Sequence, residues 1–151
     1  MLQEYKHILV AVDGSKEAEK AFNKAINNSK RNQAKLTIAH IIDTRAFQTV
    51  SSFDGILAEQ ATKIAEDTLK KHEEKAKKEG CKDVKTIIEY GSPKLIIAKQ
   101  IPSEENIDLI MLGATGLNAV ERLFIGSVSE YVIRHAQCDI LIVRTDDATL
   151  Y

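Results

Sequence analysis

Three glycines and two serines stand at a spacing that could hold a phosphate. Gly113 and Gly116 follow an apolar run, and Gly126-Ser127 comes nine residues after the second glycine. A glycine lets a backbone N–H approach an anion closely because it has no Cβ, and it reaches positive φ without penalty. The first turn of a helix beginning here would add free N–H groups and the positive end of the dipole. These residues predict a main-chain phosphate cradle, to which the hydroxyls of Ser127 and Ser129 could contribute.

Each of these residues also has a plainer interpretation. A glycine can serve only to make a turn, and a serine in front of an apolar helix is a common N-cap. The cradle requires that the two turns meet at one edge of a sheet. The elements that position the turns therefore decide between the two interpretations.

Strand and helix patterns alternate along the chain. Short, β-rich apolar runs are typical of strands covered on both faces, and the stretches between them repeat apolar residues at helical spacing. Strands are expected at 6–13, 35–42, 84–90, 108–112 and 139–144; helices are expected after Ser15, at 57–78, from Pro93 to near Pro102, and from Ser127 or Ser129. Residues 43–54 show no clear period and predict a mobile loop.

Several helix ends and buried faces follow from the same patterns. Ser15 and Ser92 are expected N-caps, and Gly80 stands where a C-terminal cap belongs. The expected buried face of the long helix is Leu57, Ala61, Ile64, Ala65, Leu69, His72 and Ala76, and that of the last helix is Val128, Val132, Ile133 and Ala136.

This order of elements predicts the α/β class. We expect one domain over residues 1–151, with an open parallel sheet of five strands, helices on both faces, and ends that could fray at about 1–5 and 145–151. In such sheets ligands bind beyond the carboxyl ends of the strands, at the switch point of the topology. Asp13 and Gly113 both fall at such ends. Asp13 could face a ligand there or simply close the turn before Ser15.

Composition narrows the class of protein. A net charge of −1 over 151 residues argues against nonspecific binding to nucleic acid. No stretch approaches the roughly 18 to 20 apolar residues of a membrane span, and no signal peptide is evident, so we expect a cytosolic protein. The two cysteines form no CxxC motif, and the four histidines form no pair at metal-ligand spacing, which indicates structural roles for all of them.

Taken together, the sequence resembles the universal stress protein family, in its nucleotide-binding branch, over nearly the whole chain. The resemblance rests on Gly-x2-Gly-x9-Gly-Ser at residues 113–127, on Ile-Leu-Val-Ala-Val-Asp-Gly-Ser at 8–15, and on Gly-Ser-Val-Ser-Glu at 126–130. It implies an adenine nucleotide alpha hydrolase-like fold with strand order 3-2-1-4-5. It also implies ATP, or ADP or AMP, lying across the ends of the first and fourth strands, with Mg²⁺ or Mn²⁺ at the phosphates.

The resemblance further implies which residues contact the nucleotide. Asp13 would lie near the nucleoside and could reach a metal through water, and backbone groups of Ile41 would meet the adenine. The full set is Ala11, Val12, Asp13, Ile41, Leu112, Gly113, Gly116, Gly126, Ser127, Val128 and Ser129. Relatives often carry a basic residue where this chain has Thr115. Arg122 could compensate, and micromolar binding of ATP is expected, about −8 kcal/mol.

These observations favour a nucleotide-dependent stress-response switch or binding module over an enzyme. The chain has no Walker-type GxxxxGK[ST] loop and no Ser-His-Asp or Cys-His arrangement, so no catalytic residue is assigned. On this hypothesis the nucleotide orders segments 43–54 and 117–125, which changes a surface that an unknown protein partner reads. A slow metal-dependent ATPase and a nucleotide-free dimeric stress protein remain alternatives.

The expected last strand indicates a further partner. Residues 139–144 would lie at a sheet edge, where an apolar strand invites pairing with another chain. The resemblance implies antiparallel pairing of this strand, so a homodimer is expected.

Overall fold

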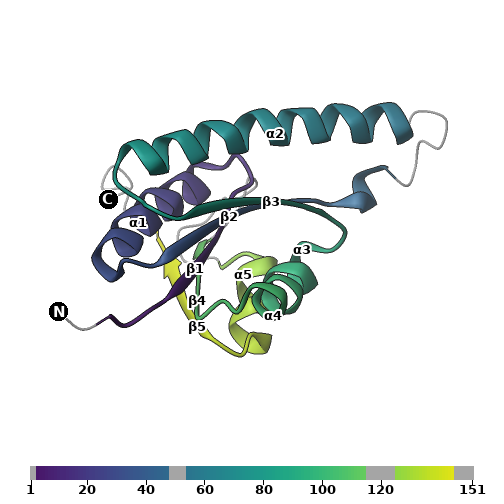
Figure 1. Cartoon of the computed structure of the whole chain (residues 1–151). Coiled ribbons are helices and arrows are strands. Elements are labelled where there is room, and N and C mark those ends of the chain that lie inside the picture. Colours follow the sequence, from purple (N-terminus) through teal and green to yellow (C-terminus); the bar gives the residue numbers. More distant parts are fainter. Residues whose placement is uncertain (1–2, 48–53, 115–124, 145–151) are drawn as a thin grey trace, which may run out of the picture.

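All five strands of the computed structural model belong to one parallel sheet (Figure 1). The structure describes residues 3–47, 54–114 and 125–144. The strands are β1 (His7–Ala11), β2 (Lys35–Ile42), β3 (Val84–Tyr90), β4 (Leu109–Gly113) and β5 (Asp139–Val143), in the order β3-β2-β1-β4-β5. The predicted fold class and strand order are confirmed, and the topology switches direction between β1 and β4.

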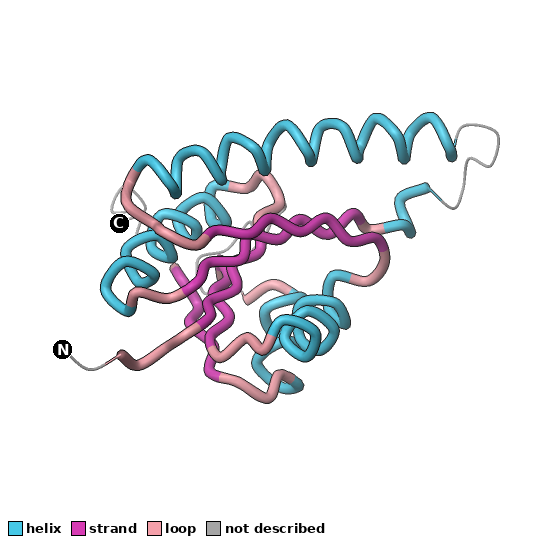
Figure 2. The backbone as a smooth tube through the Cα atoms, viewed as in Figure 1, coloured by secondary structure: helices cyan, strands magenta, loops and turns pink. Residues whose placement is uncertain are grey.

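Helices cover both faces of this sheet (Figures 1 and 2). One face carries α1 (Lys16–Asn32) and α2 (Asp54–Lys78), and the other carries α3 (Pro93–Leu95), the π-helical turn η3 (Ile96–Gln100), α4 (Ile101–Glu105) and α5 (Ser127–His135). Because side chains alternate along β1, Ile8 and Val10 enter the core under α1, while Leu9 enters the core under α5.

Local chemistry begins and ends these helices as predicted. The hydroxyl of Ser15 accepts a hydrogen bond from the Ala18 N–H at 3.1 Å and so caps α1. At the end of α2, Gly80 has φ +113° and the Cys81 N–H donates to the Ala76 carbonyl at 3.0 Å, which is the Schellman arrangement. Pro93 occupies the first turn of α3 and Ser92 stands at the N-cap position, but the Ser92 hydroxyl makes no capping hydrogen bond there.

The helix that begins at Pro93 does not end near Pro102, which corrects the sequence-based prediction. It continues through η3 and α4 to Glu105, and Asn106 ends it in the left-handed conformation at φ +55°. A proline inside a regular helix lacks an N–H and crowds the carbonyl four residues earlier. The wider π-helical turn immediately before α4, where the Ile101 N–H bonds the Ile96 carbonyl, accommodates the ring.

Three residues that were predicted to lie on buried helix faces are exposed, and the first of them is Leu57 of α2, at 36%. Ile64 of α2 is 66% exposed and Ile133 of α5 is 48% exposed, whereas their chain neighbours Ala65 and Val132 are buried. One residue along a helix rotates the side chain by about 100°, so a narrow contact stripe buries one neighbour and exposes the other. The apolar stripe that the sequence predicts on each helix is wider than the part of the helix surface that the sheet covers.

The predicted loop at 43–54 is partly wrong as well. A short 3-10 helix, η1 (Thr44–Phe47), follows β2, and α2 begins at Asp54. Asp43 starts this turn because its Oδ1 accepts a hydrogen bond from the Arg45 N–H at 3.0 Å. Residues 48–53 lie outside the described part of the chain.

The start of the chain is fastened to the domain rather than frayed at Glu4 and Tyr5. Both of their N–H groups donate to Asn32 Oδ1, at 3.0 and 3.1 Å, and the Tyr5 hydroxyl donates to Asp139 at 2.9 Å. Among the described helices, none is both long and apolar enough to cross a membrane.

Candidate functional site

The turn after β1 brings Asp13 to the carboxyl edge of the sheet. The Val12 N–H donates to the Ala39 carbonyl at 2.9 Å and continues the contact with β2, while Asp13 is exposed. Asp13 Oδ1 accepts a hydrogen bond from the Ser15 N–H at 2.9 Å. Gly14 between them has φ +87°, a conformation that favours glycine. Asp13 therefore does close the turn, and its second carboxylate oxygen remains available at the edge.

Gly113, the last residue of β4, is a glycine because α1 packs directly against it. A Cβ built at Gly113 would lie 2.7 Å from the Glu17 Cβ and 2.8 Å from the Glu17 backbone carbon. Its backbone is not in the left-handed region. The first turn of α1 thus packs against the end of β4. The contact between Glu17 and Gly113 was not predicted, because no sequence motif includes Glu17.

The start of α5 returns to the same edge of the sheet. The Gly126 N–H donates to the Ala114 carbonyl at 2.9 Å, and the Ser129 hydroxyl donates to the Gly113 carbonyl at 2.8 Å. Gly126 is the N-cap residue with φ −63° and ψ 159°, a conformation open to any residue. The start of α5 therefore meets the end of β4, but the Gly126 N–H and the Ser129 hydroxyl already serve carbonyls of the protein.

The first turn of α5 keeps other donors for a ligand. Ser127 is the first helical residue and is exposed, and Val128 is half-buried. Within the part of the chain that the structure describes, no acceptor is given for the N–H groups of Ser127, Val128 and Ser129. Free N–H groups at a helix start favour an anion. Gly116, Thr115, Arg122 and the spacer up to residue 124 lie outside the described residues.

Ile41 presents backbone groups beyond the end of β1. The register of β1 and β2 ends with Ala11 opposite Ala39, whereas β2 continues to Ile42 beside β3. The Ala39 carbonyl points towards β1, because it accepts the Val12 N–H. Peptide groups two residues apart in a strand point the same way, so the N–H and C=O of Ile41 point past Val12. This pair matches the donor and acceptor that an adenine edge offers.

The described residues contain no group of three or more His, Cys, Asp or Glu side chains that could hold a metal ion. Of the predicted site residues, Asp13 is the one that carries a carboxylate. This donor set fits a divalent cation that is held mainly by a ligand's phosphates, with Asp13 contributing through water.

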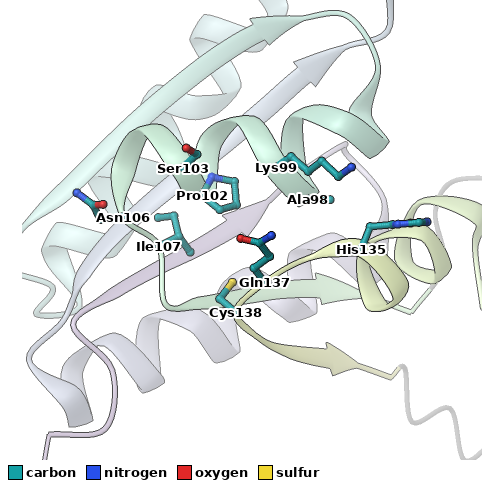
Figure 3. A pocket seen from close by; sticks show the side chains of 9 residues that line it. All are labelled: Ala98, Lys99, Pro102, Ser103, Asn106, Ile107, His135, Gln137 and Cys138. Atoms are coloured by element: carbon teal, nitrogen blue, oxygen red, sulfur yellow. The ribbon is translucent and has the colours of Figure 1, made fainter.

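A separate cavity of about 670 Å³ opens at the opposite end of the sheet (Figure 3). Its lining includes Pro102, Asn106 and Ile107 before β4, and Gln137 and Cys138 before β5. None of the described residues predicted for the nucleotide lines it. Burial, and secondarily Asp139 and Asp108, raises the pKa of the Cys138 thiol, which disfavours the reactive thiolate at this position.

The fold is that of an α/β protein in which the first turn of α5 lies at the carboxyl edge of the sheet, beside the topological switch point between β1 and β4. The family model described as the Universal stress protein family matches residues 4–144. A putative universal stress protein of Staphylococcus haemolyticus (strain JCSC1435) is 52% identical over 143 residues, covering 95% of this chain and 87% of the relative. The chain belongs to the universal stress protein family.

Solved structures agree with this assignment. The universal stress protein UspA from Lactobacillus plantarum superposes with a TM-score of 0.83 at 36% identity, covering 93% of this chain and 98% of that one. A universal stress protein in complex with cAMP superposes with a TM-score of 0.66 at 25% identity, covering 93% and 97%.

Proposed function

We propose that this chain binds an adenine nucleotide, ATP first among them, at the carboxyl edge of the sheet between β1 and β4. The observation that carries the proposal is the start of α5, which is bonded to the end of β4 and brings to this edge N–H groups that have no acceptor among the described residues. The cAMP bound to a related protein supports an adenine ligand. Adenine would meet the Ile41 backbone, and the ribose would lie between Asp13 and Gly113.

The phosphates would take the N–H groups of Ser127, Val128 and Ser129 and the Ser127 hydroxyl. Gly126 and the Ser129 hydroxyl would hold the site in place rather than bind phosphate, since their hydrogen bonds fasten α5 to the end of β4. Gly116 completes the proposed cradle, and Ala11, Val12 and Leu112 line the nucleoside. When bound, Mg²⁺ or Mn²⁺ would neutralise phosphate charge, and Asp13 would hold one of its waters.

We further propose that the bound nucleotide acts as a switch in a cytosolic stress response rather than as a substrate that is turned over. Residues of both loops predicted to respond, 43–54 and 117–125, lie beside elements that form this edge: η1 follows β2, and the spacer precedes α5. Occupancy would therefore change the surface around the edge that a protein partner contacts.

The test combines identification of the ligand with one hydroxyl deletion. Mass spectrometry of small molecules released by denaturation should find an adenine nucleotide, and titration with ATP and Mg²⁺ should give micromolar affinity. Ser127→Ala should weaken ATP binding about tenfold to a hundredfold, because a hydrogen bond to a charged group contributes about 1.5 to 3 kcal/mol. Binding of adenosine should be unchanged.

The matched control is Ser103→Ala, which removes an equally exposed hydroxyl at the cavity on the other end of the sheet. It should leave both affinities unchanged. A wild-type protein that carries no nucleotide and shows no thermal shift with ATP and Mg²⁺ would replace this proposal with a nucleotide-free stress protein.

We also propose that two copies pair along β5. This strand is at the edge of the sheet, and its apolar residues Ile140, Leu141 and Ile142 are half-buried. The Ala114 N–H donates to the Val143 carbonyl at 3.0 Å, so the peptide groups of Val143 and Leu141 face β4. Those of Ile140 and Ile142 therefore point to the open edge, where a second strand can bond them.

Ile142→Pro removes an N–H from the open edge without removing a bond to β4. Light scattering after size-exclusion chromatography should give a dimer for the wild type and for the control Ile142→Val, and a monomer for Ile142→Pro. A wild-type mass of one 16.8 kDa chain would exclude the dimer.

A further inference from the structure

The cavity at the amino ends of β4 and β5 is lined by two kinds of side chain, which lie on different sides of it (Figure 3). Lys99 and His135 lie on one side, and the apolar residues Pro102 and Ile107 lie on the other. The amide of Gln137 lies between them. The volume of about 670 Å³ is in the range of small-molecule sites. The cavity therefore offers hydrogen-bond donors and a positive charge on one side and apolar surface on the other.

The elements that carry the two basic residues are packed on the sheet. Lys99 belongs to the π-helical turn η3, in which its neighbour Ala98 is 2% exposed. Single π-helical turns within α-helices are frequent at functional sites. The ring of His135, at the end of α5, stacks against the Tyr131 ring with the centroids 4.2 Å apart. Both basic residues thus extend from segments that hold their position.

The positive charge of Lys99 is available to a ligand. None of the nine lining residues is acidic, and among the described residues no carboxylate forms an ion pair with Lys99 or His135. Glu105, at the end of the neighbouring helix α4, pairs instead with Lys85 at 2.8 Å. An anion that enters the cavity therefore meets no carboxylate among its lining residues.

The surroundings favour a ligand with a single negative charge. Burial chiefly raises the pKa of the Cys138 thiol on the apolar side, and the nearby charges of Asp139 and Asp108 raise it further. The carboxyl end of α5, at His135, adds a partial negative charge of about one half. The full charge of Lys99 outweighs that half charge for one carboxylate. A phosphate with two charges would be repelled by the same groups more strongly.

We infer that this cavity binds a small organic monocarboxylate with an apolar body. The carboxylate accepts hydrogen bonds from the Lys99 ammonium and from N–H groups of His135 and Gln137, and the apolar body packs on Pro102 and Ile107. This is a second ligand site at the opposite end of the sheet, and it does not depend on the proposed nucleotide site.

A pair of probes of equal shape tests the inference. The probes are 2-naphthoate and its neutral analogue 2-naphthamide, each titrated into the ¹⁵N-labelled protein and followed by NMR. The wild type should bind 2-naphthoate with a dissociation constant on the order of 1 mM and the amide about three- to tenfold more weakly. Signal shifts should be confined to residues 98–107 and 135–138. Saturation with ATP and Mg²⁺ should not displace the probe.

Substitution of the cation locates the carboxylate. Lys99→Gln should weaken binding of 2-naphthoate about two- to fivefold, the effect of one partly exposed ion pair, and leave 2-naphthamide unchanged. Lys99→Arg should keep the wild-type affinity. The matched control is Lys94→Gln, which removes a half-buried lysine of the preceding helix α3 that does not line the cavity. It should bind both probes as the wild type does.

Four results would each overturn the inference. They are no binding of 2-naphthoate, equal affinity for the two probes, an unchanged affinity in Lys99→Gln, and shifts centred on the start of α5 instead of the cavity. Displacement of the probe by ATP would have the same meaning, because it would place the probe at the carboxyl edge. The nucleotide proposal stands or fails separately, by the titration of the wild type with ATP and Mg²⁺.

Discussion

At the carboxyl ends of β1 and β4, backbone groups of several turns converge, whereas at the amino ends of β4 and β5 side chains surround an open cavity. The cavity has a volume of about 670 Å³, and its polar lining residues Lys99, Ser103, Asn106, His135 and Gln137 are all exposed. The carboxyl edge instead offers N–H groups held in place by hydrogen bonds to β4. The convergence of backbone donors, and not a measured cavity, is what supports the nucleotide site proposed at this edge.

The two ends of the sheet also differ in the source of the negative charge that accepts hydrogen bonds from backbone N–H groups. At the amino end, Asp108 accepts hydrogen bonds from the N–H groups of Lys6 and His7, at 2.8 and 3.0 Å. The protein thus satisfies its own donors there. At the carboxyl edge, Asp13 accepts a hydrogen bond from the Ser15 N–H, and among the described residues the first N–H groups of α5 have no acceptor, so the proposed ligand would supply the negative charge there. On the proposed function, the amino end of the sheet contributes mainly to stability and the carboxyl end to nucleotide binding.

Among the changes that test this comparison of the two ends, Gly113→Val is expected to have the largest effect. Its side chain would collide with the Glu17 backbone, and such overpacking typically costs about 1 to 3 kcal/mol, with the upper end expected here because the obstacle is main chain. Urea unfolding should show the loss, and ATP binding should fail in the folded fraction. Gly55→Ala on α2, where a Cβ meets nothing within 4 Å, should unfold like the wild type.

Replacing each of the two aspartates, Asp108 and Asp13, by alanine tests whether one end of the sheet serves stability and the other serves nucleotide binding. Asp108→Ala should lower the free energy of unfolding by about 2 kcal/mol, since it strands two backbone donors that bond a charged group. ATP binding should persist. Asp13→Ala should cost less than about 1 kcal/mol in stability, because it loses one bond in an exposed turn, but should weaken ATP binding. Equal effects of both changes on both measurements would contradict the contrast.

The smallest expected effect is a decrease in the free energy of unfolding at acidic pH. His7 bonds the Glu105 carbonyl through Nδ1 at 2.7 Å and the Thr37 hydroxyl through Nε2 at 2.6 Å. Burial is the main cause that lowers the pKa of His7 below 6.5, and it does the same for His40. The unfolded chain therefore takes up protons near pH 6.5 while the folded chain does not, so stability is lost as pH falls through the folded pKa values.

Urea unfolding at pH 7.5 and pH 5.5 should show this decrease for the wild type. His7→Gln should show a smaller decrease, although its stability at pH 7.5 will be lower. An unchanged free energy between the two pH values would contradict the lowered pKa of both histidines.

Strand positions were predictable because each strand lies between covered faces and reads as a short apolar run. The strands that the sequence predicts agree with the observed ones within two residues at each end. Helix faces were less predictable, as Ile64 and Ile133 show, because burial depends on how much of the helix surface the sheet covers. The helix continues past Pro102 because a π-helical turn precedes the proline, and no local sequence pattern predicts such a turn.

The sequence alone determined the order of elements, the caps at Ser15 and Gly80, and the glycines and serine of the cradle motif, because these depend on propensities within a few residues. Only the tertiary structure decided that Gly113 leaves room for Glu17, that Ser129 bonds Gly113, and that the Val12 N–H bonds the Ala39 carbonyl. Those contacts join segments far apart in the chain. Their geometry follows from the packing of α1, α2 and α5 on the sheet, which no single stretch of residues encodes.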